Sequence, residues 1–188
     1  MAILKVDTIS GIGTEGPVFE GDIEFTSQNF LTLPKGDTTQ RGRGRGIIAG
    51  GSPGTDNNEQ IEVINIQSDG VVTEFGELAS ARRGCAGCSS STRGLIGGGT
   101  ATNPSPSFTS SVEQIQLATT ANATTFGNLN NDTRNIGGLS NITRGLFAGG
   151  GDNPTFIDVI DFFTIASAGD ATDFGNLSVT RKGTTGVS

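Results

Sequence analysis

Two cysteines have the spacing of a metal or redox site. Cys85 and Cys88 form the string CAGC, which is typical of half a zinc ribbon or of a redox pair. A structural zinc site needs four ligands, and the sequence holds two cysteines and no histidine. Aligned copies of this segment carry Ile136 and Leu139 at the same places, so we predict that both thiols pack as small apolar side chains. A metal or redox role shared between subunits is the alternative, and we expect no metal and no cofactor within the chain.

The residue types that are missing exclude several kinds of chemistry. Without histidine the chain has no imidazole base, so a Ser–His–Asp triad is excluded within it. The acids are scattered along the sequence, which does not favour the paired carboxylates of a glycoside hydrolase. A net charge of -7 argues against a nucleic-acid partner, because such affinity comes from basic residues that neutralise phosphates. We therefore expect a non-enzymatic protein that binds no nucleic acid.

Alternating arginines in the string RGRGRG resemble a short nucleic-acid-binding segment. Arg41, Arg43 and Arg45 form this run, which stops at Ile47 and holds no aromatic residue. We interpret it as a junction whose guanidinium groups pair with carboxylates or carbonyls. The same interpretation covers the later basic residues, which are Arg82, Arg83, Arg134, Arg181 and Lys182. Three acids at equivalent positions are their candidate partners: Glu62, Glu113 and Asp161.

These residues recur because the chain repeats itself about every fifty residues. An arginine opens each unit, at Arg45, Arg93 and Arg144, with spacings of 48 and 51 residues. A Phe-Gly pair lies later in each unit, at Phe75, Phe126 and Phe174, with spacings of 51 and 48 residues. One insertion of three residues in the second unit, placed after the glycines, brings all the anchors into register.

Each unit has three recognisable parts. The first is a short apolar strand stopped by paired glycines, as in RGIIAGG, RGLIGGG and RGLFAGG. The second is mostly β-branched or aromatic and carries an acid at its second place, as in IEVINI, VEQIQL and IDFFTI. The third begins with the Phe-Gly pair and ends in serine. With 30 glycines and few helix-forming stretches, the composition predicts an all-β fold of three or four antiparallel strands per unit and almost no helix.

The paired glycines have a structural interpretation. A phosphate-binding loop would need Lys followed by Ser or Thr after its glycines, and a dinucleotide fingerprint would need a long helix, but neither follows here. We predict instead a tight backbone passage, copied near residues 50, 98 and 149, where a Cβ would clash or φ must be positive.

The unit resembles a propeller blade of the kelch kind. Kelch blades are similar in length and carry paired glycines after an apolar strand. They usually add a Tyr and a Trp, which this chain lacks, and we expect the Phe of the Phe-Gly pair to fill that packing role. The alternative is a low-complexity Gly/Thr/Asn sequence without a closed fold. Three units are too few to close a propeller, so either the sequence is part of a longer product or several copies assemble, with a homotrimer favoured. In both cases we expect that these 188 residues alone are not a well-folded monomer.

We predict two parts for the chain, an N-terminal extended arm at 1–42 and a kelch-like β-repeat domain at 43–188 with units 45–92, 93–143 and 144–188. The arm is too short for its own core and too apolar for a plain linker. It is expected to dock on neighbouring subunits or on a larger scaffold through apolar residues, namely Phe19, Phe25, Phe30, Leu33 and Pro34. The alternative is an edge strand that caps the first unit.

Two stretches carry a family resemblance. LTLPKGDTTQR, at 31–41, resembles passages that open β domains in many phage virion proteins. GCSSSTRGLIGGG and ATDFGNLSVTR are similar to tandem units of kelch-like structural or fibre-like proteins of marine cyanophages. The resemblance implies a virion protein assembled in the host cytoplasm, a tail-fibre or fibre-like appendage that meets a host surface receptor. The alternatives are a kelch-like adaptor for a protein or glycan, and a capsid decoration protein.

A recognition surface is expected on the loops that differ between units, at 52–60, 100–111 and 151–159. Polar residues there are candidates for binding a cation or sugar hydroxyls, although ordinary turns use the same types: Asp56, Asn57, Asn58, Asn103, Ser105, Asp152 and Asn153. The lack of Trp and Tyr weakens the glycan interpretation. The sequence shows neither an apolar run of membrane-spanning length nor a secretory signal, so membrane insertion is not expected.

Overall fold

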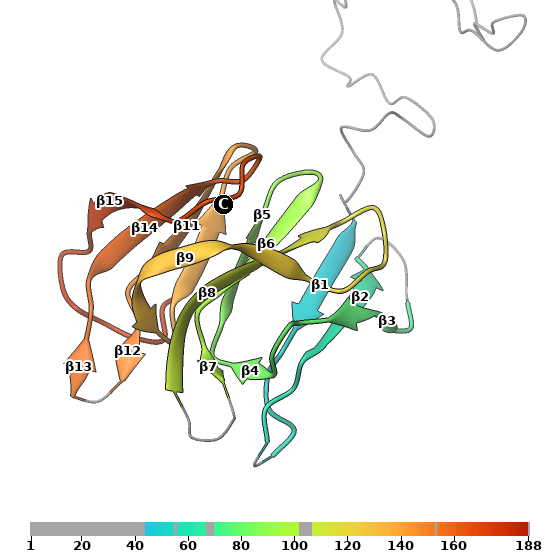
Figure 1. Ribbon diagram of the computed structural model, residues 1–188, viewed down its shortest axis with the longest axis horizontal. Coiled ribbons are helices and arrows are strands. Elements are labelled where there is room, and N and C mark those ends of the chain that lie inside the picture. The colour runs from blue at the N-terminus through green and yellow to red at the C-terminus, as the bar shows by residue number, and fades with distance from the viewer. Residues whose placement is uncertain (1–43, 55, 67–69, 102–106, 153, 188) are drawn as a thin grey trace, which may run out of the picture. The chain divides into compact units, whose positions relative to one another are not determined.

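The computed structural model describes residues 44–188 except 55, 67–69, 102–106, 153 and 188 (Figure 1). All the described residues belong to one compact unit. They form antiparallel sheets and contain no helix, which confirms the all-β prediction for this part of the chain. The predicted arm and the first arginines lie outside the described residues: Phe19, Phe25, Phe30, Leu33, Pro34, Arg41 and Arg43.

The second sheet has four main antiparallel strands, of which the first comes from the end of the first sequence unit and the other three from the second unit. Its strands are β5 (Ala86–Ser89), β6 (Arg93–Gly97), β8 (Ser107–Gln116) and β9 (Thr124–Thr133). Two short strands extend it, β4 (Arg82–Arg83) and β7 (Thr100–Ala101), of which β7 pairs with the beginning of β8.

The third sheet is built in the same way, with its first strand from the end of the second unit, and the first sheet has three strands among the described residues. In the third sheet the strands are β10 (Gly137–Ser140), β11 (Arg144–Ala148), β14 (Val159–Thr164) and β15 (Thr172–Asn176). A small hairpin of β12 (Gly151–Asp152) and β13 (Thr155–Phe156) projects from it. In the first repeat they are β1 (Arg45–Ala49), β2 (Gln60–Asn65) and β3 (Thr73–Glu77).

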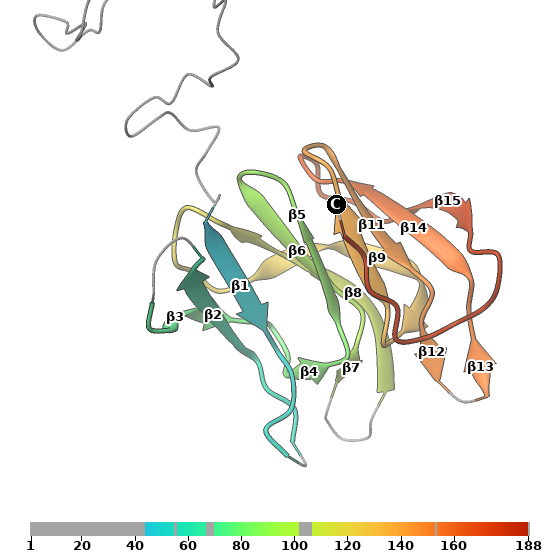
Figure 2. The same cartoon turned by 180° about the vertical axis from the view of Figure 1, so that it is seen from behind.

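The strand registers repeat as well as the strands. The opening arginines pair with Asn65, Gln116 and Thr164, which stand at equivalent places in the three units. A register shift also recurs just before the acid of the second part, at Ile61/Glu62, Val112/Glu113 and Ile160/Asp161. Figure 2 shows the three sheets following one another, each turned against its neighbour.

The core lies between the sheets. One buried cluster joins the first and second units, with Ile61 and Phe75 from one side and Ile96 and Ile115 from the other. A second cluster joins the second and third units and includes Leu95. Adjacent residues of β6, Leu95 and Ile96, thus point into different clusters, because successive side chains of a strand alternate between faces. The sheet of the second unit is therefore buried on both faces, which explains why its RGLIG string is almost wholly apolar.

The paired glycines follow one backbone path in all three units. The first glycine of each pair has φ of 69°, 66° and 68° at Gly50, Gly98 and Gly149. The second has φ of 101°, 108° and 110° at the residues that follow. These values lie in the region that side chains with a Cβ rarely adopt, and a Cβ on Gly50 would also lie 2.6 Å from the carbonyl oxygen of Arg82. The predicted tight passage is confirmed.

Candidate functional site: the junctions between units

The residues that recur most faithfully lie where one unit meets the next. The Arg45 guanidinium of the first unit donates to the carbonyl oxygen of Leu117 in the second, at 2.5 Å. Arg93 of the second unit donates in the same way to the carbonyl oxygen of Ile165 in the third, at 2.7 Å. The prediction that Arg45 pairs with a carboxylate or a carbonyl is confirmed. Its placement at a junction between the arm and the repeats stays a prediction, because the arm lies outside the described residues.

The strands that contain the Phe-Gly pairs, β3 and β9, form backbone hydrogen bonds with the next unit just after each pair. Ala123 donates its N–H to the carbonyl oxygen of Glu77, and Ala171 donates to that of Asn128, each at 2.8 Å. A side-chain oxygen of the later unit also accepts an N–H at each junction. Asn122 accepts from Glu77 at 3.1 Å and Asp170 from Asn128 at 2.9 Å, so the two junctions share one hydrogen-bond pattern.

The glycine of the Phe-Gly pair is required by this close approach. A Cβ on Gly127 would lie 1.9 Å from the carbonyl oxygen of Gly169 in the third unit. A Cβ on Gly76 would lie 2.4 Å from the carbonyl oxygen of Ala121 in the second. Real Cβ atoms do not come so near to backbone, so the second place of the pair must be glycine wherever another unit follows.

A buried ion pair crosses the first junction. Arg82 of the first unit forms a salt bridge with Glu113 of the second, and each side chain is 2% exposed. The other carboxylate oxygen of Glu113 accepts the backbone N–H of Ala79 at 2.8 Å, and Arg82 also donates to the carbonyl oxygen of Ser111 at 3.1 Å. The predicted pairing of Arg82 with the acid column is therefore confirmed. Such a pair is costly to break, because the remaining charge would stay buried.

The second junction uses the equivalent acid without a cation. Thr133 stands where the first unit has Arg82, and Asp161 accepts instead from Asn130, through its backbone N–H at 3.0 Å and its side-chain amide at 2.5 Å. The neighbouring basic residue of the second unit, Arg134, stacks on Phe108 with 4.9 Å from its guanidinium carbon to the ring centre. The sequence did not point to Asn130, because an amide among several asparagines gives no distinct signal.

The two thiols are not bridged and serve as packing groups, as predicted. Cys88 belongs to the cluster between the second and third units, where its Sγ lies 2.5 Å from the position that a Cβ on Gly145 would take. Burial raises the pKa of Cys88 to about 12, so the thiolate that a metal or an electrophile needs is scarce at neutral pH. Burial also raises the pKa of Cys85, against the opposing field of Arg82. In the described part of the chain no three Cys, Asp or Glu side chains gather as a metal site would require.

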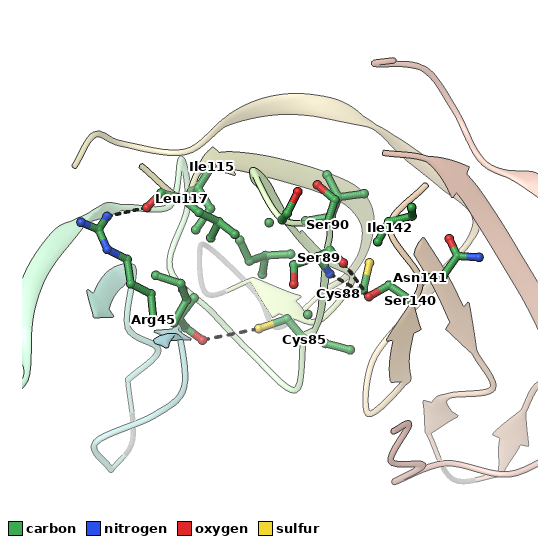
Figure 3. A pocket seen from close by; sticks show the side chains of 18 residues that line it. Arg45, Cys85, Cys88, Ser89, Ser90, Ile115, Leu117, Ser140, Asn141 and Ile142 are labelled. Atoms are coloured by element: carbon green, nitrogen blue, oxygen red, sulfur yellow. Dashed lines mark hydrogen bonds between the residues drawn. The ribbon is translucent and has the colours of Figure 1, made fainter. Parts of the chain in front are cut away.

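A groove of about 870 Å³ opens between β1 and β5 (Figure 3). Arg45 and Ile47 line one wall, and the strand from Cys85 to Ser89 lines the other. Among the described residues β1 is an edge strand, since it pairs with β2 on one side. At the far end of the groove the Ser140 hydroxyl of β10 donates to the carbonyl oxygen of Ser89 at 2.7 Å, which shows that β10 is stacked against β5. The sequence did not reveal this groove.

The predicted recognition residues that the structure describes differ in their surroundings. Asp56 is exposed, Asn58 accepts the N–H of Gln60 at 3.0 Å within its own turn, and Asn57 donates across the first junction to the carbonyl oxygen of Thr100 at 2.5 Å. Asp152 lies on β12, whereas Asn103, Ser105 and Asn153 lie outside the described residues. Asn57 and Asn58 therefore hold the fold, and their binding role stays a prediction.

Two of the three predicted loops contain strands. The segment 100–111 begins with β7 and ends in β8, and 151–159 contains the β12–β13 hairpin. The prediction of simple loops is wrong there, because Thr, Ser and Phe around the turn residues continue the ladders beyond the glycines.

Comparison with protein-family models gives no match for this chain, and comparison with curated proteins finds no relative. Over the residues that the structure describes, no helix has the length and apolar character to cross a membrane.

Proposed function

We propose that the chain is a non-enzymatic structural protein of a phage particle, part of a tail fibre or similar appendage built from kelch-like, propeller-type β units. The resemblance of LTLPKGDTTQR and of the repeat strings to virion proteins of marine cyanophages supports this proposal. In it the arm at 1–42 anchors the chain to other virion proteins, and the repeats face the host surface.

One observation carries the structural role: the residues that repeat are those that join the units. Two members of each recurring set contact a neighbouring unit: Arg45 and Arg93, Gly76 and Gly127, and Glu113 and Asp161. The segments between them differ in length and sequence from unit to unit. A chain whose repeated features are devoted to stacking is suited to building an extended or ring-shaped scaffold, because each unit is stabilised chiefly by its neighbours.

The propeller interpretation is supported by the topology. Each complete sheet is a meander of four antiparallel strands, and the apolar core lies between the faces of successive sheets. Propellers close with about four to eight such blades, and three repeats are present in this sequence, so closure needs further blades. In this proposal other copies of the chain supply them. A trimer is the assembly that the phage resemblance favours.

Labelling of purified particles tests the proposal. An antibody raised against residues 43–188 is applied to particles that carry the full chain or a variant lacking 1–42, and gold particles are located by electron microscopy. We expect label on an appendage with the full chain and none with the deletion variant, while far-ultraviolet circular dichroism shows that the shortened protein keeps its strands.

Other outcomes identify the alternatives. Label spread evenly over the capsid would indicate a decoration protein. Particles without label, together with a protein or glycan partner that the deletion variant still binds, would indicate a soluble adaptor and overturn the proposal.

A further inference from the structure

The third unit has a face that repeats the groups used at the two junctions. Arg144 stands where Arg45 and Arg93 stand, and Phe174 where two buried phenylalanines stand, yet Phe174 is 52% exposed. Arg181 is equivalent to Arg82 but is exposed. It donates to groups of its own turn, the carbonyl oxygen of Val179 at 3.2 Å and the Ser178 hydroxyl at 3.4 Å.

The first unit has the complementary face. Glu62 is its member of the acid column, equivalent to the Glu113 that Arg82 reaches at the first junction. Ile66 is equivalent to Leu117, whose carbonyl oxygen accepts a hydrogen bond from Arg45. The side chain of Ile66 is 71% exposed. Val71, at the turn that meets the Phe-Gly pair in later units, is 86% exposed. The charges match, since Arg181 is a cation and Glu62 an anion at the places that form the buried ion pair.

The last described residues of the third unit repeat a backbone stacking contact that is found earlier in the chain. A Cβ on Gly138 of β10 would lie 2.3 Å from the carbonyl oxygen of Gly87 on β5. A Cβ on Gly186 would lie at the same 2.3 Å from the carbonyl oxygen of Gly138. Residues 184–187 are thus stacked on β10 as β10 is stacked on β5. They lie where the first strand of a next sheet would lie, and among the described residues β1 has an open edge beside the groove in Figure 3.

We propose that copies of this chain associate head to tail, with the third unit of one copy docked on the first unit of the next. Arg181 pairs with Glu62, and Arg144 donates to the carbonyl oxygen of Ile66. Residues 184–187 enter the groove as a strand antiparallel to β1, with Val187 opposite Ile47 by the register of β10 on β11. A contact between two different faces propagates, so the product is a closed ring or a filament.

This inference does not depend on a virion role. A soluble adaptor with the same faces would also assemble, so failure of the labelling experiment leaves head-to-tail association standing, and the reverse also holds. The new junction lacks one bond of the internal ones, because Val71 replaces the side-chain acceptors Asn122 and Asp170. Association is therefore expected to depend on protein concentration.

Charge exchange at one residue pair tests the proposal on the full 188-residue chain by sedimentation velocity and light scattering. Arg181→Glu and Glu62→Arg are each expected to remove the assembly, because each places two like charges at the junction. In an equimolar mixture each contact between the two different variants again joins opposite charges, so we expect the mixture to associate in alternating order. The matched control is Asp132→Arg, which makes the same charge change on an exposed part of β9 and should assemble like the original protein.

The outcomes separate clearly. If the original chain has the mass of a monomer at every protein concentration measured, the proposal is overturned. So does a mixture that remains monomeric while both variants keep their strands by circular dichroism. Restored assembly in the mixture supports it, because variants that failed to fold would not rescue one another.

A disulfide test locates residues 184–187. Ile47→Cys and Val187→Cys, combined in one chain, should give an oxidised ladder of covalent multimers that a reductant collapses. The original chain, with Cys85 and Cys88, is the control and should give no ladder. If the groove is filled by residues that precede 44 in the same chain, the engineered cysteines will not link, and the proposed seat of 184–187 is wrong.

Discussion

Phe126 and Phe174 occupy equivalent positions in two units but differ in how deeply they are buried. Phe126 is 3% exposed and meets the ring of Phe163, from the next unit, edge to face at 5.7 Å between centroids. Phe174 is 52% exposed and makes a similar contact with Phe162 of its own unit at 5.9 Å. The strands, registers and glycines around them agree. The comparison shows that the sequence of a unit determines its sheet, whereas the following unit determines whether that sheet has a core.

The largest expected difference is between removing the ring of Phe126 and removing the ring of Phe174. Phe126→Ala should lower the free energy of unfolding by about 3–5 kcal/mol, since it leaves a cavity in a packed cluster. Phe174→Ala should cost under about 1 kcal/mol, as expected for an exposed residue. Both are made in the Arg181→Glu background, where Phe174 stays exposed. Urea unfolding is followed by circular dichroism, since the chain has no Trp or Tyr. Equal losses would contradict the difference between the two faces.

A slightly smaller contrast is expected for the acid column. Glu113→Gln leaves the Arg82 guanidinium buried without its counter-charge and should cost about 3–5 kcal/mol, towards the lower end because the amide still accepts. Asp161→Asn leaves no buried cation, since Asn130 is its partner, and should cost about 1–2 kcal/mol. Replacing both partners of the ion pair, as Arg82→Met with Glu113→Leu, should be milder than Glu113→Gln alone. If the double variant had a lower free energy of unfolding than Glu113→Gln alone, the ion pair itself would be shown to stabilise the junction.

The thiols give a contrast that depends on pH. The pKa of Cys88 is raised to about 12 in the folded protein and lies near 9.0 when the chain is unfolded. The unfolded state therefore releases its proton first, and the stability contributed by the neutral thiol is complete below pH 9 and lost as pH rises towards 12. By pH 10 the loss should be on the order of 1 kcal/mol. Cys88→Leu, which copies Leu139 of the next unit, should lack this component. A pH profile identical in both proteins would argue against a buried neutral thiol.

Much of the fold follows from the sequence, and the reason is periodicity. Glycine pairs and the Phe-Gly pair mark places where backbone geometry admits one residue type, so their recurrence predicted the matching paths at Gly50, Gly98 and Gly149. The first strand of the second and third sheets was not located. β5 and β10 read AGCS and GGLS, which are short, rich in glycine and without the alternation that identifies a strand.

The sequence predicted the contacts of the candidate site that join two side chains, but not those in which a backbone carbonyl is the partner. Opposite charges at matching repeat positions pointed to Arg82 and the acid column. The acceptors of Arg45 and Arg93 are carbonyl oxygens, which every residue has, so no residue type identifies them. The groove was equally invisible, since it is formed by the absence of a neighbouring strand among the described residues.

The smallest expected effect concerns the opening arginines. Arg93→Ala removes a hydrogen bond to the carbonyl oxygen of Ile165, as well as a contact over the ring of Phe126 at 5.8 Å, and should cost about 1–2 kcal/mol. Arg144→Ala, at the exposed end, loses a stacking contact with Phe162 and should change the free energy of unfolding by about 0.5 kcal/mol or less in the Arg181→Glu background. In the original chain Arg144→Ala should also weaken self-association, because its proposed acceptor lies on the next copy. If Arg144→Ala left association unchanged while Arg181→Glu removed it, the ion pair alone would hold the copies together, and the backbone part of the internal junctions would not be reproduced between chains.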